Sequence, residues 1–105
     1  MDKLLFRTLL LDFYGELLTD RQRKAFSLLY QGDLSLNEAA AELGVSAQAV
    51  WDLASRTEKT LRRYEEKLRL IEKHMKRKAA YEELMRAPGC PEGIKTLAAN
   101  IFDGE

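Results

Sequence analysis

Apolar residues recur along this chain at the three- and four-residue spacing of helix faces. The first predicted helix covers about residues 3–17, and additional leucines widen its apolar face beyond one stripe. A face this broad is typical of a helix in the centre of a core, or of one that also meets a second partner. No stretch alternates apolar and polar residues over the length of a strand. The pattern therefore predicts an all-α protein.

Hydroxyl side chains mark where the next three helices begin. Thr19 and Gln22 have the spacing of a capping box, in which the hydroxyl accepts a backbone N–H and the amide reaches back. Ser35 and Glu38 repeat this spacing, and Ser46 directly precedes another apolar-periodic stretch. We expect three further helices, each beginning after its cap.

The fourth predicted helix is long. Neither glycine nor proline occurs from Val45 to Ala87, and a seam of mostly apolar residues runs from Val50 to Met75 at alternating steps of four and three. Such a heptad pattern is typical of a helix that packs against another along its length. The seam either folds back on the first helix or forms a dimer, and a kink near residues 68–72 is compatible with it.

The stretch APGCPEG, residues 87–93, contains two prolines and two glycines and should end this helix. Beyond it, apolar residues again show helical spacing and predict a short terminal helix whose apolar face docks on the body: Ile94, Leu97, Ala98, Ile101 and Phe102. We expect three parts in one chain: a helix-turn-helix domain at 1–61, a basic helical extension at 62–86, and a loop with a short terminal helix at 87–105.

Residues 39–56, AAAELGVSAQAVWDLASR, have the pattern of a helix-turn-helix. Two helices that cross closely need a small residue in the first helix and a glycine at the turn, and Ala40 and Gly44 meet these needs. The residues expected to be buried around them are Ala39, Leu43, Val45, Val50 and Leu53. The motif defines an architecture, whereas function depends on its exposed residues.

The exposed residues at the start of the second helix of this motif are expected to be Ser46, Ala47, Gln48, Trp51, Asp52 and Ser55. Gln48 suits an adenine edge and Ser46 a phosphate. Asp52 would repel phosphates, and the nearby cations Arg56 and Lys59 are balanced by Asp52 and Glu58, which weakens the case for duplex DNA. Trp51 either lies in the core, stacks on a base or meets another protein.

Positive charge is concentrated in one segment although the chain has 17 Lys/Arg and 17 Asp/Glu. Residues 62–78 contain three glutamates and eight cationic residues: Arg62, Arg63, Lys67, Arg69, Lys73, Lys76, Arg77 and Lys78. A charged run on a helix is either a solvated face, a contact to a nucleic-acid backbone, or a contact to an acidic protein.

The sequence gives little support for a disulfide, a metal site, a catalytic centre or membrane insertion. Cys90 is the only cysteine and His74 the only histidine, so we expect no disulfide, metal, other cofactor or catalytic centre, and a reducing cytoplasm. The most apolar stretch, residues 4–18, is interrupted by charges and is shorter than the roughly 20 apolar residues that span a bilayer. We expect neither a secretion signal nor membrane insertion.

Several blocks in this order resemble the YlxM-like proteins, small bacterial helix-turn-helix proteins similar to region four of sigma factors: LDFYGELLT (11–19), Gln22, DLSLNEAA (33–40), VSAQAVWD (45–52) and LRRYEEKL (61–68). The resemblance covers about residues 4–75. It implies an all-helical cytoplasmic protein with an accessory role in the signal recognition particle pathway, because the family's genes commonly neighbour those of the particle's protein and receptor. Ala47 stands where the family usually has arginine, and Trp51 where it has tyrosine.

Three hypotheses follow. In the first, residues 62–78 contact the particle's RNA or protein; in the second, Ser46, Gln48 and Trp51 read promoter DNA; in the third, the chain is a homodimer. The candidate nucleic-acid-binding residues are Ser46, Gln48, Trp51, Arg56, Arg62, Arg63, Lys67, Arg69, Lys73, Lys76, Arg77 and Lys78.

Overall fold

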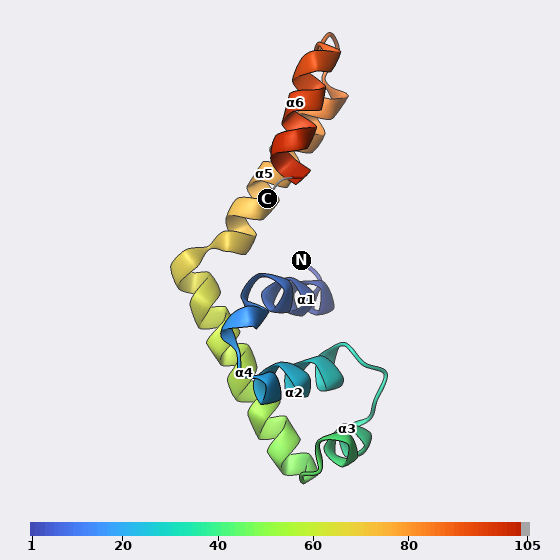
Figure 1. Ribbon diagram of the computed structural model, residues 1–105, viewed down its shortest axis with the longest axis vertical. Helices are drawn as coiled ribbons and strands as arrows, with labels where there is room; N and C mark the ends of the chain where they lie inside the picture. Colours follow the sequence, from blue (N-terminus) through green and yellow to red (C-terminus); the bar gives the residue numbers. More distant parts are fainter. Residues whose placement is uncertain (104–105) are drawn as a thin grey trace. The chain divides into compact units, whose positions relative to one another are not determined.

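A computed structural model describes residues 1–103, and its regular structure is entirely helical over that range (Figure 1). The elements are α1 (Lys3–Tyr14), the 3-10 helix η1 (Gly15–Leu17), α2 (Asp20–Tyr30), α3 (Leu36–Leu43), α4 (Ala47–Leu68), α5 (Leu70–Arg86) and α6 (Glu92–Asp103). The all-α prediction is confirmed. Gly104 and Glu105, the last residues of the predicted 87–105 part, lie outside the described residues.

The chain divides into two compact units. The first is Met1–Arg69, where α4 contacts α1, α2 and α3, and the second begins at Leu70, where α5 packs against α6 (Figure 1). Within residues 1–103, no helix is long and apolar enough to cross a membrane.

Most of the core of the first unit comes from side chains of α1, α2 and α4: Leu10, Tyr14, Ala25, Phe26, Val50, Ala54, Thr57 and Leu61. The first half of the predicted seam is therefore buried within the chain by its own helices. Its polar member, Thr57, donates a hydrogen bond to the Leu53 carbonyl at 2.7 Å, which offsets the cost of burying a hydroxyl. The Tyr14 hydroxyl donates to Glu65 at 2.5 Å.

All three predicted helix caps are present. The Thr19 hydroxyl accepts the Gln22 N–H at 3.1 Å while the Gln22 side chain accepts the Thr19 N–H at 2.9 Å. Ser35 and Glu38 form the same reciprocal pair, at 3.1 and 3.0 Å. Ser46 caps α4 by accepting the Ala49 N–H at 3.1 Å. Local sequence alone thus specifies these three starts.

The long helix ends earlier than the uninterrupted seam suggests, within the range where a kink was expected. Arg69 has φ 54, in the left-handed region, and its N–H bonds the Glu65 carbonyl at 2.8 Å. This conformation closes α4 at Leu68, and α5 begins anew at Leu70. The seam therefore does not run through one helix from Val50 to Met75.

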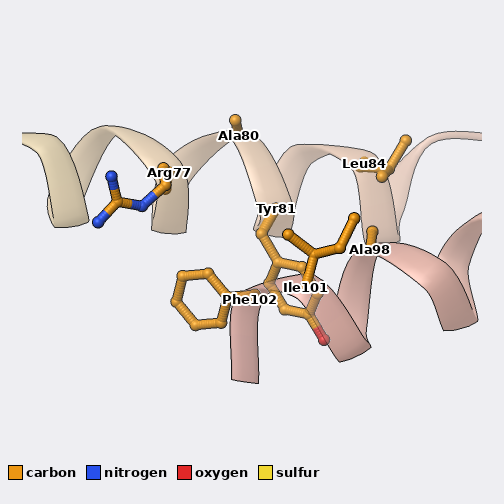
Figure 2. A pocket seen from close by; sticks show the side chains of 7 residues that line it. All are labelled: Arg77, Ala80, Tyr81, Leu84, Ala98, Ile101 and Phe102. Atoms are coloured by element: carbon orange, nitrogen blue, oxygen red, sulfur yellow. The ribbon is translucent and has the colours of Figure 1, made fainter. Parts of the chain in front are cut away.

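The second unit is a helical hairpin joined by the predicted breaker. The Tyr81 and Phe102 rings stack with centroids 4.9 Å apart (Figure 2), and His74 stacks on Phe102 at 5.6 Å. The terminal helix exists as predicted, but the docked part of its apolar face is smaller than expected. Ile94, Leu97 and Ile101 remain exposed because they lie to one side of the face that meets α5.

Candidate nucleic-acid interface

The helix-turn-helix is formed by α3, the turn at Gly44 and the start of α4. Gly44 has φ 69, which side chains disfavour, and its neighbour Val45 donates to the Ala40 carbonyl at 3.1 Å. Ala39, Ala40 and Val50 form a buried cluster. The predicted Leu43 and Val45 pack against this cluster, together with Leu28, Leu36 and Ala47. The motif therefore has the predicted small contacts at its crossing.

The first turn of α4 is arranged differently from the expected reading surface. Ala47 was expected to face outward, which is wrong: it is half-buried because it packs against the buried cluster of Ala39, Ala40 and Val50. The Gln48 amide donates to the Asp52 carboxylate at 2.9 Å, so one of its polar groups is engaged within α4. Trp51 is 49% exposed, which settles that it lies at the surface and not in the core.

A row of four exposed cations continues along the outer side of α4. We call it the cationic ridge: Arg56, Lys59, Arg63 and Lys67. Steps of three and four residues place these side chains on one helix face. The Arg56 guanidinium donates a hydrogen bond to the Asp52 carbonyl at 3.3 Å, which holds the Arg56 side chain close to the helix backbone at the start of the ridge.

Glu58 does not balance this ridge, contrary to the expectation from sequence. It accepts hydrogen bonds from Arg7 at 2.6 Å and from Arg62 at 3.1 Å, and its side chain is only 17% exposed. Burial raises the pKa of the Glu58 carboxyl, but the two guanidinium groups outweigh that effect and leave the pKa below its ordinary value. The Arg7 guanidinium also covers the Tyr30 ring at 3.9 Å.

Arg62 belongs to this internal network and not to the ridge. Besides its bond to Glu58, its guanidinium lies over the Phe6 ring at 5.0 Å. Lys59, which was not among the candidate residues, joins the ridge. The spacing from Arg56 could have identified it, whereas the contact from Glu58 to Arg7 spans 51 residues and leaves no local signal.

The eight cations predicted at 62–78 are shared between the two units. Four belong to the first, Arg62, Arg63, Lys67 and Arg69, and four to the second, Lys73, Lys76, Arg77 and Lys78. Lys76 forms an exposed ion pair with Glu72 at 3.6 Å. Arg63 and Lys67 are therefore the members of the predicted segment that share a surface with Arg56.

Together, α3, the left-handed Gly44 and α4 define a helix-turn-helix protein. Residues 1–100 match the model of the UPF0122 family, described as "Putative helix-turn-helix protein, YlxM / p13 like". The chain belongs to this family, which confirms the resemblance found in the sequence.

Individual relatives agree with this assignment. The chain is 45% identical over 101 residues to a UPF0122 protein of Shouchella clausii, covering 96% of this chain and 93% of the relative. It is 49% identical over 87 residues to one of Halalkalibacterium halodurans, covering 83% and 80%. A third, from Caldanaerobacter subterraneus subsp. tengcongensis, is 47% identical over 83 residues, covering 79% and 71%.

Proposed function

We propose that this protein is a non-enzymatic, cytoplasmic accessory protein of the signal recognition particle pathway that binds the particle's RNA. One observation carries the proposal: the cationic ridge presents four exposed cations on one face of α4, while Glu58, the acidic residue expected to offset them, is paired inside the unit. Rows of exposed cations bind phosphate backbones by releasing counterions. The resemblance to YlxM-like proteins supports this pathway.

RNA fits the first turn of α4 better than duplex DNA does. In a recognition helix this part of α4 would lie against duplex DNA, where the Asp52 carboxylate would be repelled by the phosphates. The Gln48 amide, which could otherwise read a base, already donates a hydrogen bond to that carboxylate. Specific RNA recognition more often uses unpaired bases that stack on aromatic side chains. In the proposal, the exposed Trp51 provides such a surface near the start of α4, and Ser46 contacts a nearby phosphate.

The second unit carries exposed cations of its own. Lys73 and Lys78 are exposed on α5, and Lys76 has only an exposed pair, which solvent screens strongly. Arg77 lies on the same helix. These residues would supply additional backbone contacts, and their removal should lower affinity without changing which RNA is preferred.

The test is filter binding of the particle's RNA over a salt series. The ridge variant carries Lys59→Glu, Arg63→Glu and Lys67→Glu. If each cation contacts one phosphate, the slope of log Kobs against log salt falls by about three, and affinity at about 0.1 M salt falls at least tenfold.

A matched control carries the same change of charge elsewhere in the first unit, by Lys3→Glu, Arg21→Glu and Lys24→Glu, all at exposed positions. The proposal requires this control to keep most of the affinity and of the salt slope. Equal losses in the two variants would mean that net charge alone governs binding, and equal binding by both variants and the unmodified protein would refute the role of the ridge.

Reading of promoter DNA is a second candidate, favoured by the exposure of Gln48 and Trp51 at the start of α4. Selection from random duplexes should then enrich one motif. Gln48→Ala should relax the preference at one position, corresponding to a loss of about 1–3 kcal/mol. If no motif is enriched, this candidate fails.

A further inference from the structure

The cationic ridge leads to a carboxylate near the start of α4. Asp52 lies four residues before Arg56, and Gln48 lies four residues before Asp52, so both continue the steps of the ridge along the same helix face. Both side chains are exposed. A strand whose phosphates follow the ridge would therefore reach Asp52 at this end. Because a carboxylate repels phosphate, Asp52 is suited to bind a different part of the nucleotide.

Gln48 holds this carboxylate in one orientation. Its amide donates a hydrogen bond to Asp52 Oδ1 at 2.9 Å. A carboxylate has about four acceptor positions on its two oxygens, and this bond uses one of them. Within residues 1–103, the structure shows no other partner for the Asp52 side chain. The carboxylate is thus oriented by its own helix, while both oxygens can still accept hydrogen bonds from a ligand.

The chemistry of a carboxylate determines which base it can recognise. When ionised it only accepts hydrogen bonds, and it can accept two parallel bonds from neighbouring donors. Guanine is the base whose Watson–Crick edge has two neighbouring donors, the ring N1–H and the exocyclic amino group. On that edge, adenine and cytosine place a ring acceptor beside their amino group, and uracil has its N–H between two carbonyls. A carboxylate therefore pairs with guanine and meets a repulsive acceptor on every other base.

We propose that Asp52 selects an unpaired guanine, which bonds the carboxylate through N1–H and the amino group while Gln48 orients it. The inference rests on the proposed RNA binding and names the base that this end of α4 prefers. The guanine must be unpaired because base pairing occupies the same edge in a duplex. Trp51, the residue before Asp52, is 49% exposed and offers an aromatic surface next to the bound base. Arg56 begins the row of cations for the phosphates of the same strand.

The first experiment varies the RNA and leaves the protein unchanged. The probes are short oligouridines, either unsubstituted or with guanine, adenine, cytosine or hypoxanthine at a single central position. Quenching of Trp51, the only tryptophan, reports their binding to the full chain. The guanine probe should bind at least about fivefold more tightly than the adenine, cytosine and unsubstituted probes, which is the low end for a bidentate base contact. Hypoxanthine keeps N1–H but lacks the amino group, so its probe should bind with intermediate affinity.

Asp52→Asn removes the pair of acceptors without changing the shape of the side chain. An amide has one acceptor and one donor group, so the guanine preference should fall to less than about twofold. Affinity for the unsubstituted probe should be retained or rise, because a negative charge beside the ridge is removed. The matched control is Asp33→Asn, which removes the same charge at an exposed position between α2 and α3. This control should keep the full preference.

Gln48 is a positioning residue in this proposal, because it acts through Asp52. Gln48→Ala keeps the carboxylate but frees its rotation. The guanine preference should therefore fall about twofold, while affinity for the unsubstituted probe stays nearly unchanged. A purely structural role would change the affinities for all probes together and leave their ratio constant, which would contradict the assigned role of Gln48.

Three results would overturn the inference: equal affinity for all probes, no quenching by any of them, or a guanine preference that survives Asp52→Asn. These results differ from failure of the proposed function. Particle RNA that still binds through the ridge in the filter assay would leave the ridge without a base-selective site. Conversely, a guanine preference that requires Asp52, in a protein with no affinity for the particle's RNA, would keep the guanine site and remove the pathway.

Discussion

Replacing Glu58 by Gln tests whether the internal network holds α1 to α4. Glu58 bonds Arg7 of α1 at 2.6 Å and Arg62 of α4 at 3.1 Å, and the three side chains are 17%, 19% and 42% exposed, respectively. Gln has the same shape but no charge. The substitution therefore leaves the two guanidinium groups close together without the carboxylate between them.

The expected loss of unfolding free energy is about 2 kcal/mol. A hydrogen bond to a charged group contributes about 1.5–3 kcal/mol when shielded from water, which applies to the bond from Arg7. The bond from Arg62 is discounted to about 0.5 kcal/mol or less, because that side chain is well exposed and solvent screens the pair.

Urea unfolding followed by the fluorescence of Trp51 measures this loss. Trp51 is the only tryptophan and lies in α4, so its signal reports the first unit. Glu66→Gln is the matched control, because Glu66 is exposed on the same helix. If Glu58→Gln costs no more than this control, the reasoning about the network is wrong.

The difference in stability between the unmodified protein and Glu58→Gln should depend on pH. The Glu58 pKa is lowered in the folded protein, so the stability contributed by its charge is present above the ordinary value of 4.5 and is lost as pH falls through the lower, folded pKa. Gln does not titrate. The difference between the two proteins should therefore narrow below about pH 4.5, and a difference that stays constant down to pH values where both begin to unfold would contradict an ionic origin.

Three further substitutions test the fold. Gly44→Ala should cost about 1 kcal/mol in urea unfolding, because Gly44 has φ 69; a Cβ there would meet no atom within 4 Å, so the cost is that of the backbone alone. Gly44→Asn should cost less, and the reverse order would dispose of this explanation. Leu61→Ala should destabilise the first unit by about 2–5 kcal/mol, since Leu61 is fully buried; a loss below 1 kcal/mol in thermal unfolding would show that the site collapses easily. Ser35→Ala should cost about 1 kcal/mol and Ser35→Asp much less, because aspartate also caps helices; equal losses by calorimetry would exclude capping as the cause.

Features determined by neighbouring residues could be predicted from the sequence. The caps at Thr19, Ser35 and Ser46 each need only a hydroxyl and a backbone N–H three residues on. The left-handed turn at Gly44 follows from the absence of a side chain. These interactions lie within one helical turn, so local sequence contains all the atoms that take part.

Features that join distant segments, or that break a local preference, could not be predicted. Nothing at Arg69 signals a left-handed residue, because the flanking sequence favours helix on both sides. Glu58 turns inward because Arg7, far away in sequence, lies beside it in the folded unit. Of the candidate site, the helix-turn-helix and the exposure of Arg56, Arg63 and Lys67 follow from periodicity, whereas the internal role of Arg62 does not.

The end of α4 at Arg69 also determines how the protein should respond to heat. An uninterrupted helix would couple both ends of the chain, so that melting at one end would propagate to the other. A left-handed residue between two separate packing units interrupts this propagation. The large core around Phe26 and Leu61 and the small hairpin can then lose their structure in separate cooperative steps.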